Sequence, residues 1–129
     1  MGSITVDSSE WPLVRVTYVD TVDDKAFDAY VAQQVAVLDR REPYVILFDA
    51  RRSGIPTARQ RQKIAQFTKD REHDLKRYCK KGVFVIPNPL VRGALTAILW
   101  LQPLPFPHDV VASIEEAEKV LAVERRAFA

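Results

Sequence analysis

The sequence predicts an α/β fold in which strands and helices alternate around a mainly parallel sheet of four to five strands. Residues 44–48 (YVILF) and 83–86 (VFVI) are continuous apolar runs, typical of strands buried on both faces of a parallel sheet. Segments with helical spacing of apolar residues separate these runs, and parallel strands require such crossovers. The chain has 129 residues, of which 47% are hydrophobic, so we expect a single domain over residues 1–129.

The N-terminal part predicts a β-hairpin followed by a helix. β-rich segments at residues 4–6 and 13–19 flank the turn-forming residues 7–10. Asp23 or Asp24 then supplies a side chain that can accept hydrogen bonds from the first N–H groups of a helix. Residues at spacings of three and four mark the buried face of this helix, which is expected to consist of Phe27, Tyr30, Val31, Gln34, Val35 and Leu38.

The centre of the chain predicts a strand, a loop and one long helix. The strand at residues 44–48 is followed by an Arg-, Ser-, Gly- and Pro-containing loop at residues 51–56. Thr57 and Gln60 have the spacing of a capping box, which starts a helix that runs to about Cys79. The inward residues of that helix are expected to be Ile64, Phe67, Leu75 and Tyr78.

The C-terminal part completes the order ββαβαβαβα. Gly82 separates the long helix from the strand at residues 83–86. Asn88 caps a strongly apolar helix over residues 89–102, which has Pro at its first position. A short strand follows at residues 109–112. The final helix begins at a second capping box, Ser113 with Glu116, and is expected to bury Ile114, Ala117, Val120 and Leu121.

Charge is distributed unevenly along the chain, although the net charge is only +2. Residues 1–50 contain 4 Lys and Arg against 9 Asp and Glu, residues 51–81 contain 11 against 3, and residues 82–129 contain 4 against 5. A basic helix can bind nucleic-acid phosphates. This segment has neither interleaved exposed aromatic residues nor helix-turn-helix spacing. We therefore expect a solvated face that pairs with the acidic N-terminal third, and nucleic-acid binding is unfavoured.

Several features favour a cytoplasmic protein. Cys79 is the only cysteine, so no intramolecular disulfide can form. The N-terminus lacks the basic and apolar regions of a secretory signal. The apolar stretch at residues 90–101 contains Arg92 and is shorter than the roughly 20 residues that span a bilayer. We expect no membrane span.

No catalytic or metal motif stands out in the sequence. GxGxxG, P-loop and GxSxG patterns are absent. His73 and Cys79 share the long predicted helix but point about 120° apart, so they do not form a Cys–His pair. His108 has only Asp109 beside it, and two histidines with one cysteine make a poor zinc site. We expect no catalytic residue, no metal and no cofactor.

The residues that follow the second buried strand form the first candidate site. Ligands of open parallel sheets bind beyond the carboxyl ends of the strands, where a helix N-terminus offers free N–H groups to an anion. Asp49, Arg51, Arg52 and Gly54 are the expected anion- or partner-binding residues, and Ser53 and Thr57 are possible phosphoacceptors. The alternative is a solvated loop with an ordinary helix cap.

The apolar helix over residues 89–102 forms the second candidate site. Leu99 lies beside Arg92 and Thr96 on the nominally polar face, and Trp100 lies near its edge. A helix that is apolar almost all round is buried on more than one side, so another chain, a lid or a ligand is one expected cover. The alternative cover is the final helix with the proline-rich loop. The candidate surface comprises Arg92, Thr96, Leu99, Trp100, Leu104 and Phe106.

The element order, together with the segment FDARRSG after the second buried strand, resembles the STAS domain, the fold of bacterial anti-sigma factor antagonists. Many members have an Asp at the end of this strand, then a Ser-Gly pair. The resemblance implies Asp49, Ser53 and Gly54 as counterparts, with a partner kinase that phosphorylates Ser53 and so switches partner choice. Residues 50–52 intervene between the Asp and the Ser here. The chain is more similar to a divergent STAS-like branch grouped with CRAL-TRIO lipid-carrier domains.

These observations lead to two hypotheses of function. The first is a non-enzymatic regulatory module that binds a protein partner through the arginine–serine loop and the apolar helix. It would be controlled by phosphorylation and would self-associate as a homodimer. The alternative is a carrier of a small apolar ligand or lipid, which requires a cavity beneath the apolar helix and the proline-rich loop.

Overall fold

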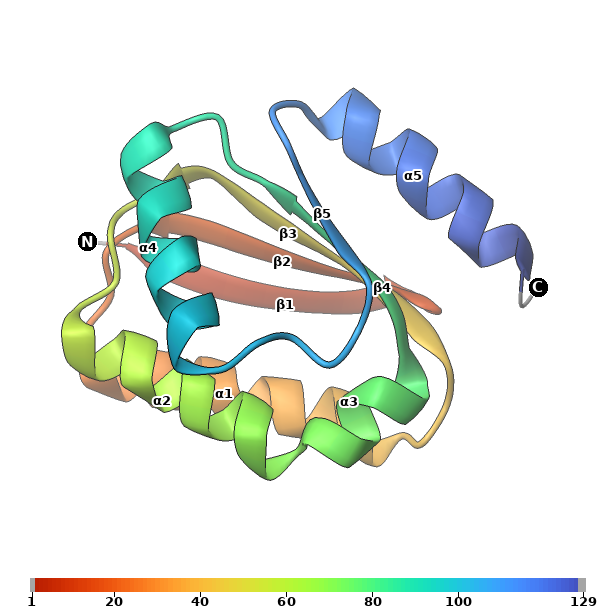
Figure 1. Cartoon of the computed structure of the whole chain (residues 1–129), viewed down its shortest axis with the longest axis horizontal. Coiled ribbons are helices and arrows are strands. Elements are labelled where there is room, and N and C mark those ends of the chain that lie inside the picture. The colour runs from red at the N-terminus through yellow and green to blue at the C-terminus, as the bar shows by residue number, and fades with distance from the viewer. Residues whose placement is uncertain (1, 128–129) are drawn as a thin grey trace.

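The computed structural model describes residues 2–127, which form one sheet with helices on both of its faces (Figure 1). The strands are β1 (Ser3–Glu10), β2 (Leu13–Asp20), β3 (Tyr44–Ser53), β4 (Cys79–Val85) and β5 (His108–Val111). The helices are α1 (Asp24–Asp39), α2 (Ala58–Asp70), α3 (Glu72–Tyr78), α4 (Pro89–Leu101) and α5 (Ile114–Ala127). The predicted order ββαβαβαβα is confirmed, with one predicted helix divided into α2 and α3.

The five strands lie in the sheet in the order in which they occur in the chain. β1 is antiparallel to β2, and every other neighbouring pair is parallel. This mixed sheet confirms the prediction of a mainly parallel sheet with an antiparallel N-terminal strand. The carboxyl ends of β2, β3 and β4 therefore meet at one edge of the sheet, where the chain leads into α1, α2 and α4.

Each face of the sheet has its own apolar core, because successive side chains of a strand point to opposite faces. Ile46 and Phe48 of β3 belong to the core beneath α1, α2, α3 and α4. Val45 and Leu47 of the same strand pack with Leu121 of α5. Figure 1 shows α5 apart from the other four helices, on the opposite side of the sheet. The cavities described below lie in the larger core.

The predicted helix starts are confirmed by the side chains that cap them. Asp23 accepts a hydrogen bond of 2.8 Å from a first-turn N–H group of α1. Thr57 and Gln60 form a reciprocal capping box at the start of α2. Asn88 accepts a hydrogen bond of 2.8 Å from the backbone of α4. These caps satisfy N–H groups that have no partner inside their helices.

The predicted inward faces of the helices are confirmed for their central positions. The residues that are buried as predicted are Phe27, Tyr30, Gln34, Leu38, Phe67, Leu75, Tyr78, Ala117 and Leu121. The residues that are only partly buried at the margins of these faces are Val31, Val35, Ile64, Ile114 and Val120. Val37 is buried without having been predicted so.

The N-terminal hairpin is longer than predicted, and its turn lies elsewhere. Residues 7–10 belong to β1 rather than to the turn, which is formed by Trp11 and Pro12. The pairing of β1 with β2 shifts register between Asp7 and Glu10, as at a β-bulge. A bulge on an edge strand tolerates the same polar residues as a turn, which explains the wrong assignment.

The segment predicted as a loop after Phe48 is partly strand. β3 continues to Ser53, so Asp49 lies inside the strand, and Arg51 and Arg52 are strand residues. The extension pairs with β2 up to Asp20, again after a register shift. Charged side chains at the end of a strand can point to solvent while the backbone keeps its ladder, so composition did not reveal the extension.

The long helix predicted in the centre of the chain is broken into α2 and α3, although it ends at Tyr78, close to the predicted end at Cys79. Arg71 interrupts it with φ −112° and ψ 24°, and its guanidinium donates to Asp39 of α1 at 2.9 Å. β4 begins at Cys79, so Gly82 lies inside a strand and does not break a helix. A Cβ atom at Gly82 would lie 2.6 Å from the ring of Phe106, so glycine is required there by packing.

Candidate functional site

Asp49 and Arg51 form an ion pair on the α5 side of the sheet. Arg51 Nε lies 3.0 Å from Asp49 Oδ1, and Arg51 Nη2 lies 2.9 Å from Asp49 Oδ2. These hydrogen bonds hold the pKa of Asp49 below its usual value. Asp49 alternates in step with Val45 and Leu47, whose side chains lie under α5. The guanidinium of Arg51 is thus already paired with a carboxylate of the same chain.

Ser53 and Gly54 lie on the other side of the sheet, where they line a cavity beneath α4. Ser53 is half-buried, and its hydroxyl donates to the Gly54 carbonyl at 2.7 Å. A Cβ atom at Gly54 would lie 2.5 Å from the Thr21 methyl group and 3.1 Å from the backbone of Asp20 and Thr21, so the chain approaches β2 closely at this glycine. The structure therefore separates Ser53 from the pair of Asp49 and Arg51 with which it was grouped.

Arg52 and Thr57 are both exposed. Thr57 Oγ1 accepts a hydrogen bond of 3.1 Å from the backbone N–H of Gln60. Among residues 2–127, no carboxylate oxygen lies within 4.0 Å of the Arg52 side chain. Thr57 is the accessible hydroxyl at the start of α2, where a phosphate would meet backbone N–H groups.

The outer side of α4 carries large apolar side chains that are exposed to solvent. Trp100 is 84% exposed, Leu90 is 68% exposed and Leu101 is 56% exposed. Gly93 and Ala97 lie between them at helical spacing, and a Cβ atom at Gly93 would meet nothing within 4 Å. We call these five residues the α4 stripe. Within residues 2–127, the final helix does not cover it, since α5 packs on the opposite face of the sheet.

The other residues predicted for this surface divide between the exterior and the interior. Arg92 and Thr96 are exposed. Leu99 and Leu104 are half-buried and line a cavity together with Phe106. Phe106 is fully buried, because its ring packs against Gly82, so it belongs to the interior and not to an outer surface.

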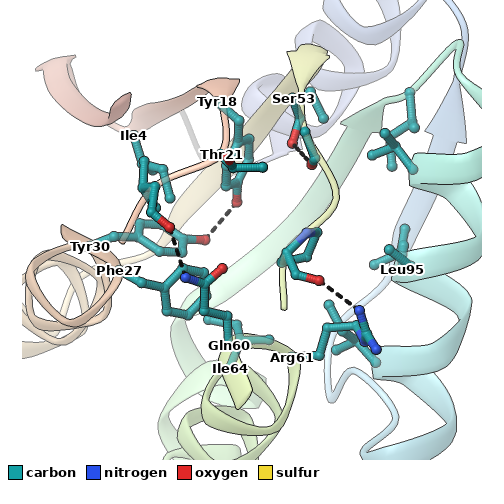
Figure 2. A pocket seen from close by; sticks show the side chains of 18 of the residues that line it. Ile4, Tyr18, Thr21, Phe27, Tyr30, Ser53, Gln60, Arg61, Ile64 and Leu95 are labelled. Atoms are coloured by element: carbon teal, nitrogen blue, oxygen red, sulfur yellow. Dashed lines mark hydrogen bonds between the residues drawn. The ribbon is translucent and has the colours of Figure 1, made fainter. Parts of the chain in front are cut away.

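Two apolar cavities, of about 110 Å³ and about 100 Å³, lie between α4 and the sheet. α4 packs beside α2, and Val91 and Ala94 of α4 line the first cavity. Figure 2 shows the first cavity surrounded by side chains from the hairpin, α1, the end of β3, α2 and α4. The side chains that line both cavities are Tyr18, Tyr30, Ile64, Phe84, Leu95 and Ile98. The apolar-ligand hypothesis requires such a cavity.

The tyrosine hydroxyls at the cavity wall are paired with each other. Tyr18 Oη and Tyr30 Oη are 2.6 Å apart, and Gln34 Nε2 donates to Tyr30 at 3.0 Å (Figure 2 shows the tyrosine pair). Burial raises the pKa of both tyrosines, so both hydroxyls remain neutral at physiological pH. Gln60 is satisfied as well, because its Nε2 donates to the Val22 carbonyl at 2.9 Å. These groups leave the interior without charge.

Arg61 is the cation that lines the first cavity. It is half-buried, and its Nη1 donates to the Pro56 carbonyl at 2.6 Å (Figure 2). No carboxylate oxygen of residues 2–127 lies within 4.0 Å of it. Its neighbours on α2 differ, since Arg59 and Lys63 both pair with aspartates of α1. Arg61 therefore keeps N–H groups available for an anion.

Arg61 and the tyrosine pair were not predicted from the sequence. Arg61 precedes Ile64 by three residues and Thr68 by seven, which places it on the inward side of α2. This spacing was the one feature of the sequence that could have indicated an inward-facing Arg61. The meeting of Tyr18 with Tyr30 depends on how α1 packs against the hairpin, and no local pattern encodes it.

The cysteine and the histidines lie in separate environments. Cys79 is buried on β4, and burial raises the pKa of its thiol to about 12, which makes it a poor nucleophile. His73 is exposed on α3. Across residues 2–127, no group of three His, Cys, Asp or Glu side chains is placed to hold a metal ion. No helix in this described part of the chain is long and apolar enough to cross a bilayer.

Neither a family model nor a curated protein sequence matches the chain. Three solved structures are similar to it over nearly their whole length. An uncharacterised protein of the DUF3478 family with a SpoIIAA-like fold, from Shewanella loihica PV-4, has a TM-score of 0.68 at 12% identity, with 94% of this chain and 95% of that chain covered.

The other two structures are anti-sigma factor antagonists. One is from Mycobacterium paratuberculosis, with a TM-score of 0.64, 12% identity and 95% of each chain covered. The other is SpoIIAA in its unphosphorylated form, with a TM-score of 0.65, 13% identity, and 93% of this chain and 98% of that chain covered. Together with the element order and sheet topology, these similarities show that the chain has a STAS-like fold.

Proposed function

We propose that this chain is a non-enzymatic regulatory module that binds a protein partner through the α4 stripe. The observation that supports this most strongly is the exposure of Trp100, Leu90 and Leu101 on one helix. Isolated exposed apolar residues are ordinary, but three large ones on one side of the same helix favour an interaction surface.

The composition of the α4 stripe suits a helix-sized contact. Gly93 and Ala97 have little or no side chain, so a partner's backbone could approach α4 closely between Leu90 and Trp100. Tryptophan is the residue type most enriched among those that dominate binding energy, at about 2 kcal/mol or more when truncated. We expect Trp100 to be the main anchor.

The fold gives independent support for a protein partner. Two of the similar structures are anti-sigma factor antagonists, proteins named for their action on other proteins. At 12–13% identity the similarity supports the class of function and identifies no partner. A second copy of this chain is the alternative occupant of the α4 stripe, and the proposed homodimer would form in that way.

Phosphorylation of Thr57 is the proposed control. Thr57 is exposed and caps α2, so a phosphate there would meet the N-terminal N–H groups and the positive end of the helix dipole. α2 packs beside α4, which places the added charge on the helix next to the α4 stripe. Ser53 is the weaker candidate, because it is half-buried and its hydroxyl already donates to Gly54.

Affinity capture with paired variants tests this proposal. We expect wild type and Val123→Ser, which changes an exposed apolar residue of α5, to retain the same protein from a native lysate. Trp100→Ser should lose that protein, and Thr57→Asp should change its amount. Retention of the same protein by Trp100→Ser would contradict the proposal. Sedimentation of purified chain at increasing concentration separates a partner from a second copy.

A second candidate function is the binding of a small apolar ligand. Its specific support is the pair of cavities of about 110 Å³ and about 100 Å³ beneath α4, lined mainly by aliphatic and aromatic side chains. An engineered apolar cavity of about 150 Å³ suffices to bind benzene. Saturable binding of an apolar probe such as octanol, lost when Leu95→Trp fills the cavity wall, is the expected result, and no binding would refute it.

A further inference from the structure

We propose that the cavities beneath α4 take a carboxylic acid with a single apolar chain, whose carboxylate is bound by Arg61. This inference rests on the second candidate function, the binding of an apolar ligand, and adds the chemical class of the ligand. It is independent of partner binding at the α4 stripe, which lies on the outer side of the same helix.

The interior favours an apolar chain because it offers no unsatisfied polar group. Among residues 2–127, no buried side-chain nitrogen or oxygen lacks a hydrogen-bond partner. The hydroxyls of Tyr18 and Tyr30 bind each other, and Tyr30 also accepts from Gln34, so a polar chain would gain at most one new hydrogen-bond donor from this pair. A hydrocarbon chain would bury its surface against Leu95, Ile98 and their neighbours.

The rim favours an anion because of the way in which the charges of α1 and α2 are paired. Arg59 lies 3.5 Å from Asp24, and Lys63 pairs with Asp28, so α1 neutralises two of the three cations in this part of α2. Arg61 lies between them in sequence but lines the cavity, and within the described residues 2–127 its hydrogen-bond acceptor is the Pro56 carbonyl. A free guanidinium beside an apolar space matches a bound carboxylate.

One acidic side chain also lines this cavity, and it does not neutralise Arg61. Asp20 lies at the end of β2 and is exposed, and no ion pair among residues 2–127 joins it to Arg61. The hydroxyls of Tyr18 and Tyr30 stay neutral, because burial raises their pKa, and so do not repel an anion. The wall of the cavity formed by the tyrosine pair is therefore uncharged, and Arg61 provides a positive charge at another position of the wall.

The size of the cavities limits the ligand to one short chain or one ring. Their volumes of about 110 Å³ and about 100 Å³ are each below the roughly 150 Å³ that accommodates benzene, but the two cavities are adjacent and have lining side chains in common. Ile64 and Leu95 are among these, and the proposed ligand requires them to move so that the two spaces join. A medium-length chain fits such a space, whereas the two chains of a membrane phospholipid do not.

Calorimetric titration of the full chain with octanoate and with octanol tests the inference. Octanol has the same chain without the carboxylate, so it reports the cavity alone. We expect octanoate to bind at least tenfold more tightly than octanol. Arg61→Gln should weaken octanoate binding by about 10- to 100-fold, because a hydrogen bond to a charged group is lost, and should leave octanol unchanged. Arg59→Gln is the matched control and should change neither.

The possible results separate the two levels of the proposal. If octanol and octanoate bind equally and Arg61→Gln has no effect, the apolar cavity is a binding site but the carboxylate assignment is wrong. If neither probe binds, both the assignment and the second candidate function fail. Circular dichroism of each variant establishes that a loss of binding is not a loss of folding.

Discussion

α4 and α5 are helices of similar length, 13 and 14 residues, that lie on opposite faces of the same sheet. Each has two buried residues, Val91 and Ala94 for α4 and Ala117 and Leu121 for α5, and the α5 pair is the more deeply buried. They differ in what remains outside. The rest of α5 is mostly charged, whereas the rest of α4 is mostly apolar.

The two helices also contact the sheet differently. α5 packs directly onto β3 and β4, and its small residue Ala117 permits a close approach. α4 packs beside α2, and the space between α4 and the strands is only partly filled, which leaves the two cavities. Close packing of an amphipathic helix indicates a structural role. Exposed apolar residues on α4 are the observation on which the proposed interaction surface rests.

We expect the largest effect on the free energy of unfolding from truncation of a buried side chain of α5. Leu121→Ala removes a fully buried side chain from a close-packed core, so we expect a loss of about 2–5 kcal/mol in the free energy of unfolding by urea. Leu95→Ala removes a half-buried side chain that already borders a cavity, and we expect about 1 kcal/mol. Equal losses of unfolding free energy in the two variants would contradict the difference in packing between α4 and α5.

An intermediate effect is expected from the tyrosine pair at alkaline pH. The pKa of Tyr18 and of Tyr30 is raised in the folded chain, so the unfolded chain loses these protons first, near pH 10. The free energy of unfolding should therefore fall as the pH rises above about 10, by up to about 1.4 kcal/mol per pH unit for each tyrosine. Denaturation of Tyr18→Phe across this range should show a shallower fall, and an unchanged slope would count against burial of this pair beneath α4.

The smallest effect on stability is expected at the exposed apolar residues of the two helices. Trp100→Ser and Val123→Ser both change side chains that are mostly exposed, at 84% and 64%, so each should alter the free energy of unfolding by no more than about 0.5 kcal/mol. Their effects on partner capture should nevertheless differ, as proposed above. A large destabilisation by Trp100→Ser would show that this residue supports the fold rather than an interaction.

The sequence predicted the architecture well because the fold is encoded locally. Buried strands such as residues 44–48 are continuous apolar runs, and the caps at Asp23, Thr57 and Asn88 have distinctive side chains. The predicted ends of helices and strands were wrong where the same local composition is compatible with two different structures. Gly82 has the composition of a helix stop, but its actual role is to admit the ring of Phe106 from a distant segment.

The candidate site was predicted only in part, for the same physical reason. The exposed Trp100 and the helix start at Thr57 follow from helical periodicity and capping chemistry. The cavity does not, because it is formed by side chains from distant segments of the chain, and no local pattern encodes how these pack. The separation of Ser53 from Asp49 depends on a register shift within β3, which composition does not reveal.

Hydrogen–deuterium exchange of the backbone amides, with and without octanoate, tests the contrast between the two helices most directly. The account predicts that amides in residues 94–101 of α4 exchange faster than those in residues 117–121 of α5, because local opening of α4 disrupts less packing. Octanoate should then slow exchange in α4 and leave α5 unchanged. Faster exchange in α5, or no response of α4 to octanoate at saturating concentration, would contradict it.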